Sequence, residues 1–147
     1  MLSVRKMRIK DKTEVLEMVS SFYSSEAVDH KVPDCILERT FMDAVGQEPC
    51  IWGVLLCDGD AVVGFAYMTV CYACEVGGRT LILEELYLKA ESRGKGYGRQ
   101  FFTWMFKEYP DILRFRLEVT KNNEGAIALY ERLGFQYLQY GQMVHDR

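Results

Sequence analysis

The chain has 147 residues, of which 49% are apolar, and this length suits one domain with a full hydrophobic core. Its net charge of −3 argues against a nucleic-acid-binding protein, which usually carries a strong basic excess. No apolar run approaches the ~18 residues of a membrane span, and charged residues stand where a signal peptide needs an apolar stretch, so we expect a cytoplasmic protein with no membrane partner.

The first half of the chain predicts one strand, two helices and a hairpin. Apolar residues at helical spacing predict helices over 11–24 and 33–45; Asp11 or Thr13 is expected to cap the first, and Gly46 to end the second. Strands are expected over 4–9, 51–57 and 61–71. The last two are joined by Asp58-Gly59-Asp60, a sequence typical of a hairpin turn.

The second half predicts strands over 79–88 and 114–120, each followed by a helix, over 96–109 and 123–133. Gly134 is expected to stop the last helix in a left-handed conformation, with Phe135 contacting the helix behind it. Two short closing strands are expected over 135–138 and 142–145. Because hairpins mix with strand–helix units, the sequence indicates an α/β or α+β fold with a mixed sheet, in a single domain over residues 1–147.

The five cysteines are odd in number and irregular in spacing, which argues against a disulfide framework. Cys71 and Cys74 form a lone C-x-x-C, but a metal site needs more ligands and the only histidines are His30 and His145. We therefore expect no metal, and buried or half-buried thiols on a strand.

A glycine-rich loop between a strand and a helix carries the strongest functional signal. It runs Arg93-Gly94-Lys95-Gly96-Tyr97-Gly98-Arg99. Glycines let a large group approach the backbone, and the free amides at the start of the next helix attract anions, which predicts a phosphate site. The loop lacks the Lys-Ser/Thr of a P-loop and the spacing of a dinucleotide fingerprint. The alternative is a plain turn with solvated basic residues.

With a second motif, this loop resembles that of the GNAT N-acetyltransferases. Arg93 to Gly98 match the family pattern Q/R-x-x-G-x-G/A, and the run from Asn123 to Phe135 matches its later motif of Asn, Ala, Tyr and Gly-Phe. The resemblance covers essentially the whole chain. It implies the GNAT fold: a mostly antiparallel sheet of about six to seven strands, about four helices, and a V-shaped splay between the parallel strands 81–88 and 114–120. The stretch 83–88 is similar to the spermidine/spermine acetyltransferase branch.

The resemblance implies acetyl-CoA as cofactor. In relatives the splayed strand bonds the pantetheine arm, the glycine loop holds the pyrophosphate, and residues of the later motif contact coenzyme A. The positions that match these contacts are Leu86, Tyr87, Leu88, Arg93, Gly94, Lys95, Gly96, Tyr97, Gly98, Arg99, Asn123, Ala126, Tyr130 and Arg132.

Acetyl transfer to an amine needs a proton acceptor, because an alkylamine with a pKa near 10.4 is almost wholly protonated at pH 7. Glu84 matches the presumed base of the polyamine branch and is favoured, with Glu85 and Glu118 as alternatives; a bulge in the strand would reverse which glutamate faces which side. Tyr130 matches the family's general acid. The alternatives are an ion-paired or solvated glutamate and an ordinary helix aromatic.

Charge is uneven along the chain: residues 21–60 carry a net −6 and residues 89–132 a net +3. A cationic amine suits the acidic part and polyanionic coenzyme A the basic part. By resemblance, Tyr23, Glu26, Asp29 and His30 are candidate substrate residues. The expected acceptor is a primary amine of a small molecule (a polyamine, amino acid or aminoglycoside), reacting in a ternary complex. Protein lysines or N-termini, or a non-catalytic acyl-CoA sensor, are alternatives, and a homodimer is possible.

Overall fold

A computed structural model of the chain describes residues 1–28 and 30–147. In chain order the elements are β1 (Leu2–Lys6), η1 (Ile9–Asp11), α1 (Lys12–Tyr23), α2 (Asp34–Val45), β2 (Ile51–Asp58), β3 (Ala61–Ala73), β4 (Gly78–Leu88), η2 (Ala90–Ser92), α3 (Tyr97–Glu108), β5 (Arg114–Leu117) and α4 (Glu124–Arg132).

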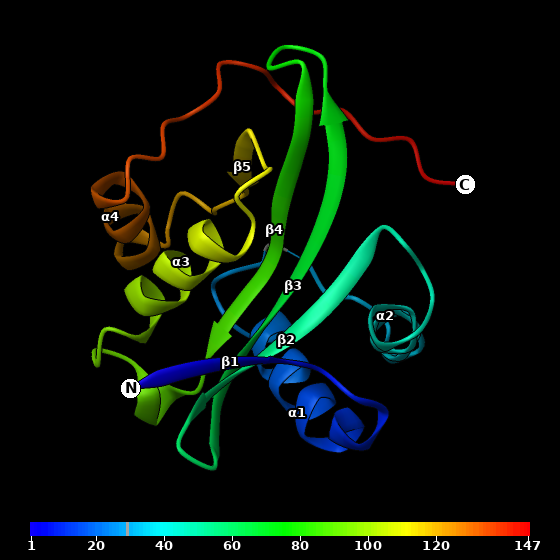
Figure 1. Cartoon of the computed structure of the whole chain (residues 1–147). Helices are drawn as coiled ribbons and strands as arrows, with labels where there is room; N and C mark the ends of the chain where they lie inside the picture. The colour runs from blue at the N-terminus through cyan, green and yellow to red at the C-terminus, as the bar shows by residue number, and fades with distance from the viewer. Residues whose placement is uncertain (29) are drawn as a thin grey trace.

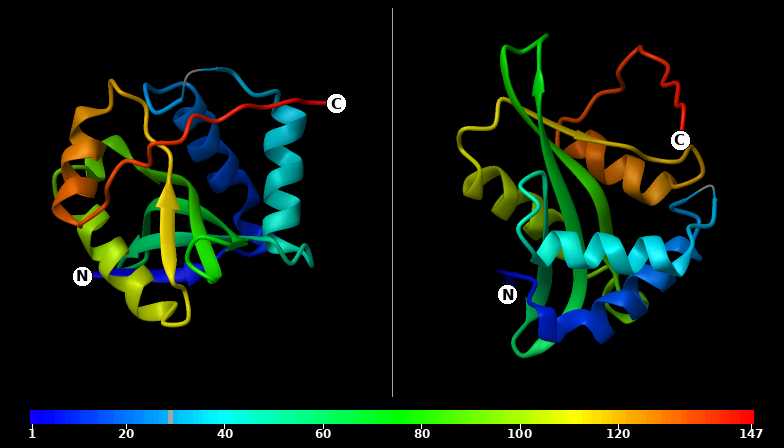
Figure 2. Two further views of the ribbon diagram at one scale, coloured as in Figure 1. Left: turned by 90° about the horizontal axis from the view of Figure 1, so that it is seen from above. Right: turned by 90° about the vertical axis from the view of Figure 1, so that its right-hand side faces the viewer.

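The five strands form one sheet in the order β1-β2-β3-β4-β5. All neighbours are antiparallel except β4 and β5, which are parallel. Helices α1 and α2 cover one face, and α3 and α4 cover the other (Figures 1 and 2). The expected α/β class, the mixed sheet and the four helices are therefore confirmed.

Each face of the sheet has its own hydrophobic core. Phe41, Phe65 and Tyr67 are central to the core beneath α1 and α2, and Phe101 and Phe102 to the core beneath α3 and α4. Alternate residues of β2 and β3 feed the two cores, because successive side chains of a strand point to opposite faces. Strands buried on both faces explain the continuous apolar runs of the sequence.

Strands β4 and β5 are paired along only part of their length. Their register runs from Thr80 opposite Arg114 to Leu83 opposite Leu117 and stops there. β4 continues for five residues to Leu88. The expected splay between the two parallel strands is therefore present, and it begins after Leu83.

A β-bulge lies at the same point of β4. Tyr67 of β3 stands opposite Glu85, but the next residue, Met68, stands opposite Leu83, so Glu84 is the extra residue of the bulge. The bulge breaks the alternation: Leu83 faces the α3 core, whereas Glu85 reaches α1. The sequence left open that a bulge would change which side of the sheet each glutamate faces, and β4 contains such a bulge.

Helix α4 begins and ends with the local signals of its sequence. Asn123 Oδ1 accepts a hydrogen bond from the Ala126 amide at the N-terminus. At the other end Gly134 has φ +90°, and the amide of Phe135 donates to the carbonyl of Tyr130. This is a Schellman motif, with the Phe135 ring packed on Tyr130. The predicted stop at Gly134 is confirmed.

Three expectations about the chain ends and the hairpin were wrong. No strand follows Leu117 in the described part of the chain, so the closing strands over 135–138 and 142–145 are absent and the sheet has five strands. The first strand ends at Lys6, and Ile9 belongs to the η1 turn. Cys71 and Cys74 are exposed rather than buried, because they lie where the β3–β4 hairpin extends beyond the helices (Figure 1).

Asp11 ties β1 to the start of α1, although it does not cap α1 with its side chain. Its carboxylate accepts two hydrogen bonds from Arg5, at 2.8 and 3.0 Å, and one from the Arg8 amide at 2.8 Å. These bonds, that of Arg5 above all, hold the pKa of Asp11 below its usual value. The buried carboxylate therefore stabilises the folded chain through its ionised form.

Replacing Asp11 by alanine is expected to lower the free energy of unfolding by about 2 kcal/mol at pH 7, since three bonds to a charged group are lost. Because the folded pKa is lowered, this contribution is fully present above the unfolded pKa of about 3.9 and is lost as the pH falls through the folded value. Urea unfolding of Asp11→Ala against the parent at pH 7 and in acid measures it. The exposed Asp60→Ala serves as control, and an equal loss in both variants would contradict the prediction.

Candidate active site

Glu85 lies at the centre of a polar cluster inside the α1 side of the molecule. Its side chain is nearly buried, with the residue 8% exposed. The hydroxyl of Tyr23, at the end of α1, donates to Glu85 Oε1 at 2.5 Å. Burial raises the pKa of Glu85 to about 7; the charge of Glu84 adds to this, and the bond from Tyr23 opposes it. The carboxyl can therefore take up and release a proton near neutral pH, as a general base must.

Glu84 is the neighbouring carboxylate, yet its surroundings differ. Its side chain is exposed and accepts a hydrogen bond from Thr69 Oγ1 on β3 at 2.7 Å. The bulge therefore gives two adjacent glutamates opposite settings, one solvated and one buried. Of the two, only Glu85 is in contact with a predicted substrate residue, Tyr23.

Tyr67 also belongs to this cluster, although the sequence did not single it out. It stands directly opposite Glu85 on β3 and is 1% exposed. Within the part of the chain that the structure describes, neither its hydroxyl nor Glu85 Oε2 has a hydrogen-bond partner. In the sequence it is one aromatic residue in an apolar strand, and only the β3–β4 register reveals its place beside a carboxylate.

The glycine loop joins η2 to α3 in the form that the phosphate prediction requires. Gly94 and Gly96 both have left-handed φ values, +74° and +79°, and Gly96 is the N-terminal cap of α3. The amides of the first turn have no acceptor within the helix and lie at its positive end. Arg93, Lys95 and Arg99 are exposed around them. The loop can therefore hold an anion with backbone and side-chain donors together.

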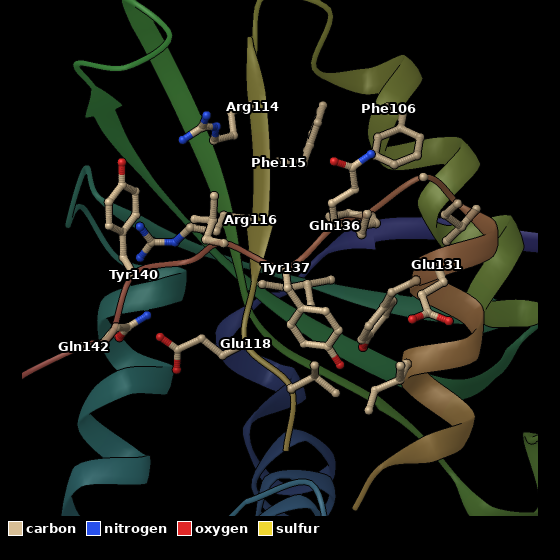
Figure 3. A pocket seen from close by; sticks show the side chains of 18 residues that line it. Phe106, Arg114, Phe115, Arg116, Glu118, Glu131, Gln136, Tyr137, Tyr140 and Gln142 are labelled. Carbon is tan, nitrogen blue, oxygen red and sulfur yellow. The ribbon is translucent and has the colours of Figure 1, made fainter. Parts of the chain in front are cut away.

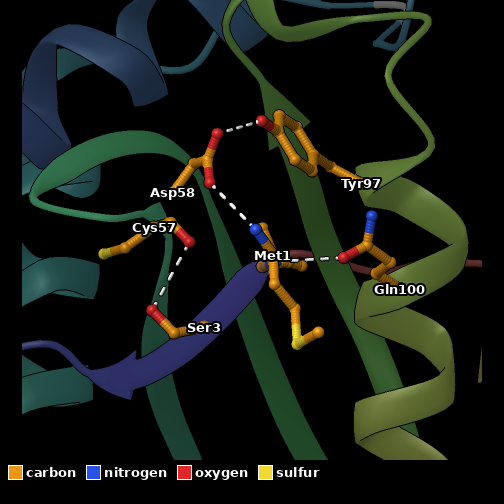
Figure 4. Close-up of polar contacts among 7 residues, drawn as sticks. Met1, Ser3, Cys57, Asp58, Tyr97 and Gln100 are labelled. Carbon is orange, nitrogen blue, oxygen red and sulfur yellow. Dashed lines mark hydrogen bonds and ion pairs between the residues drawn. The ribbon is translucent and has the colours of Figure 1, made fainter.

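Contacts to the edge of the sheet fix the start of α3. Tyr97 is buried, and its hydroxyl donates to Asp58 Oδ2 at 2.5 Å (Figure 4). One turn on, Gln100 Oε1 accepts from the Leu2 amide at 3.0 Å. Gly98 lies so close to α4 that a Cβ would come within 3.1 Å of Leu129. The first turn of α3 is thus held on two sides, with little freedom to move its amides.

The splayed end of β4 leads from Glu85 to this loop. Leu86, Tyr87 and Leu88 are half-buried and lie beyond the last β4–β5 pair. Arg93 folds back over this end: its Nε donates to the Leu88 carbonyl at 3.1 Å, and its guanidinium lies 5.7 Å from the centre of the Tyr87 ring. The predicted pantetheine strand and the predicted pyrophosphate loop are therefore in contact.

Tyr130 lines a cleft of about 670 Å³ between β5, α4 and the C-terminal tail (Figure 3). Its ring packs against Phe102 and Phe135. Burial raises the pKa of its hydroxyl, which therefore stays protonated at neutral pH and available as a donor. Glu118, an alternative base, is exposed and lines the same cleft. Neither Glu85 nor the glycine loop lines this cleft. Of these three predicted features, only Tyr130 does.

The remaining predicted residues have more varied settings. Asn123 caps α4, Ala126 donates to that cap, and Arg132 is exposed in the last turn. Glu26 and His30 are exposed. The Glu26 carbonyl accepts from Thr120 Oγ1 at 3.0 Å, which brings the segment after α1 against the segment after β5. Asp29 lies outside the described residues.

Metal binding and membrane insertion are two other functions on which the described residues bear. No group of three His, Cys, Asp or Glu side chains within residues 1–28 and 30–147 is placed to hold a metal ion. Among the helices described, none has the length and apolar character needed to cross a bilayer.

Comparison with protein families identifies the chain. A family model described as "Acetyltransferase (GNAT) family" matches residues 13–135, which include all of α1 but its first residue, the glycine loop and α4. The chain belongs to the GNAT family. It is therefore an acetyltransferase that depends on acetyl-CoA, and the resemblance seen in the two sequence motifs is confirmed.

Similar proteins match nearly the whole chain. The mouse thialysine N-epsilon-acetyltransferase is 27% identical over 150 residues, covering 92% of this chain and 84% of the mouse protein. A possible acetyltransferase from Clostridium difficile 630 has the same fold, with a TM-score of 0.83, 20% identity and coverage of 99% and 97%. A predicted acetyltransferase from Clostridium acetobutylicum, in its structure with acetyl-CoA, gives a TM-score of 0.78 at 17% identity, covering 99% and 96%.

Proposed function

We propose that this GNAT enzyme acetylates a primary amine of a small molecule, by direct transfer from acetyl-CoA within a ternary complex. The observation that carries the proposal is Glu85, a buried carboxyl with a pKa of about 7 that is in contact with α1. One of its oxygens has no hydrogen-bond partner among the described residues. Such a group suits the removal of a proton from an amine at neutral pH.

Glu85, rather than the initially favoured Glu84, is assigned as the general base. The acceptor enters as an ammonium ion, and freeing its lone pair at pH 7 costs roughly 4–5 kcal/mol in water. Glu85 takes that proton, and the neutral nitrogen then attacks the thioester carbonyl. Glu84, by contrast, is exposed to solvent and accepts its hydrogen bond from Thr69, away from the Tyr23 side chain.

Tyr130 is assigned as the general acid. As the C–N bond forms and the C–S bond breaks, its hydroxyl gives a proton to the leaving thiolate, and the nitrogen loses its second proton. The net products are an amide, the coenzyme A thiol and one proton. Support comes from the raised pKa of Tyr130, which keeps its proton in place until the sulfur departs.

The cofactor-binding residues are assigned to β4 and the loop. The main chain of Leu86 to Leu88 suits a pantetheine amide, since it lies beyond the last pair with β5. The first-turn amides of α3, with Lys95 and Arg99, suit the pyrophosphate. Asn123 contributes through the N-terminus of α4, because its side chain already caps that helix.

The acidic segments around α2 favour a cationic acceptor. Tyr23, with Glu26 and His30 on the segment that follows it, is assigned to the acceptor side. The mouse relative is named for thialysine, an amino acid with an amine at its end, which favours a small molecule over a protein. A cytoplasmic location fits the five free cysteines, and a homodimer stays a proposal.

The test is a thiol-release assay with acetyl-CoA and a panel of polyamines, amino acids, aminoglycosides and lysine peptides. We expect small amines to react with kcat/KM at least tenfold above that of any peptide. Binding of acetyl-CoA with no amine reacting would point instead to a sensor module, and preference for a peptide would point to a protein acetyltransferase.

Replacing Gly96 by alanine is expected to weaken acetyl-CoA binding at least tenfold, because the added Cβ disfavours the left-handed backbone that aims the loop amides. Calorimetric titration with acetyl-CoA measures this. Gly77→Ala is the matched control: Gly77 has φ +66° in the β3–β4 turn, so the two variants share the strain but not the site. Equal affinity in both variants would remove the loop from the cofactor site.

A further inference from the structure

The proposed base and the residue that faces it each leave a buried polar atom without a hydrogen-bond partner among residues 1–28 and 30–147. They are Glu85, through Oε2, and Tyr67, through its hydroxyl. The residues stand opposite one another in the β3–β4 ladder, where Cβ atoms are about 5 Å apart. Buried polar groups are almost always hydrogen-bonded, so two unpaired atoms on facing residues call for an explanation.

Stability does not explain the Tyr67 hydroxyl. Burying a hydroxyl without a hydrogen bond destabilises a fold, and phenylalanine would fill the same space beside Phe65 without that penalty. The hydroxyl has therefore to act in a state other than the free enzyme.

The carboxyl of Glu85 has two hydroxyl donors within its surroundings, and only one is engaged. Tyr23, on α1, already donates to Oε1 and is half-buried, so it lies nearer to solvent than Tyr67. An ammonium N–H arriving from the acceptor side is a donor of the same kind as the Tyr23 O–H. The two compete for the same carboxylate oxygen.

We propose that Tyr67 is a positioning residue: when the acceptor amine displaces the Tyr23 hydroxyl from Glu85, the Tyr67 hydroxyl becomes the donor that holds the carboxylate. The carboxyl turns from α1 toward β3, the amine takes the place that Tyr23 leaves, and the buried hydroxyl gains the bond that it lacks in the free enzyme. This inference rests on the proposed role of Glu85 as the base.

The titratable groups around Glu85 determine how the proposal would change the pKa of its carboxyl. Tyr23 faces it from α1, Tyr67 from β3, and Glu84 and Tyr87 are its neighbours on β4. A hydroxyl that donates to the carboxylate favours its charged form and so lowers its pKa. Tyr23 has this effect in the free enzyme, and the proposal gives it to Tyr67 in the acceptor complex.

The test compares Tyr23→Phe and Tyr67→Phe by single-turnover thiol release, with enzyme in excess over acetyl-CoA. The acid limb of the pH–rate profile measured at low acceptor concentration reports the pKa of the base in the enzyme without acceptor. The acid limb measured at saturating acceptor reports its pKa in the acceptor complex. We expect Tyr23→Phe to move only the low-acceptor limb, and Tyr67→Phe only the saturating limb, each upward by about one pH unit.

The controls distinguish a failure of the role proposed for Tyr67 from a failure of the role proposed for Glu85 as the base. Tyr72→Phe, an exposed tyrosine of the same strand, is expected to move neither limb, and Tyr67→Phe is expected to melt no lower than the parent. A lower melting temperature, no limb shift, or a shift of both limbs in Tyr67→Phe would overturn the inference. Glu85→Gln tests the foundation: if it keeps the acid limb, the base assignment has failed, whereas loss of that limb with no effect of Tyr67→Phe removes Tyr67 alone.

Discussion

Glu85→Gln is expected to lower kcat/KM by about 10²–10³-fold, which is the lower part of the usual contribution of a general base. Glutamine has the same shape and can still accept the Tyr23 hydrogen bond, so the protein is expected to fold. The loss reflects chemistry, because an amide cannot take the proton of the acceptor ammonium.

The pH profile makes this result specific. Since burial raises the pKa of Glu85 to about 7, its basic form becomes populated as the pH rises through that value, and kcat/KM is expected to rise with it. Glu85→Gln is expected to flatten this rise. Glu84→Gln is the matched control, and we expect its kcat/KM to stay within about threefold of the parent, as for most exposed substitutions. A large loss in Glu84→Gln with an active Glu85→Gln would return the base to Glu84.

Tyr130→Phe is expected to lower kcat about 10²-fold while the Kd for acetyl-CoA stays within about twofold. Phenylalanine keeps the ring contacts with Phe102 and Phe135, so packing is retained. It removes only the hydroxyl proton that the leaving thiolate takes.

Steady-state rates at saturating acceptor and calorimetric titration with acetyl-CoA measure the two quantities. Tyr137→Phe is the control, because Tyr137 is an exposed tyrosine that lines the same cleft. Should Tyr130→Phe turn over as fast as the parent, Tyr130 has no part in the chemistry. Should its affinity for acetyl-CoA fall as much as its kcat, it binds the cofactor rather than protonating the product.

Features specified by neighbouring residues were predictable from the sequence. The glycine loop is an example, since Gly94 and Gly96 adopt the backbone that only glycine favours. The end of α4 is another, because Gly134 and Phe135 form a local motif. The helices accordingly begin and end within about two residues of their predicted bounds.

Features that depend on strand partners were not predictable. The choice between Glu84 and Glu85 is decided by a bulge, and a bulge exists only in the pairing with β3. No local pattern in the sequence indicated a functional role for Tyr67, because its carboxylate neighbour Glu85 lies 18 positions away. The tail from Phe135 has strand-like composition, but its first residue packs onto α4 and Tyr140 bonds Glu75 in the β3–β4 turn instead.

The position of the bulge has a consequence for β4. If Glu84 were deleted, Thr80, Ile82, Glu85 and Tyr87 would still alternate onto the α1 face, and the two cores would keep the same side chains. The inserted residue is thus not needed to direct the β4 side chains into the two cores. Its effect is on the hydrogen bonds of the main chain. Glu84 has no ladder partner on β3, and the pairing with β5 ends one residue earlier. The sheet therefore has a gap in its hydrogen-bond network near its middle, where a bound molecule rather than another strand can complete the ladder.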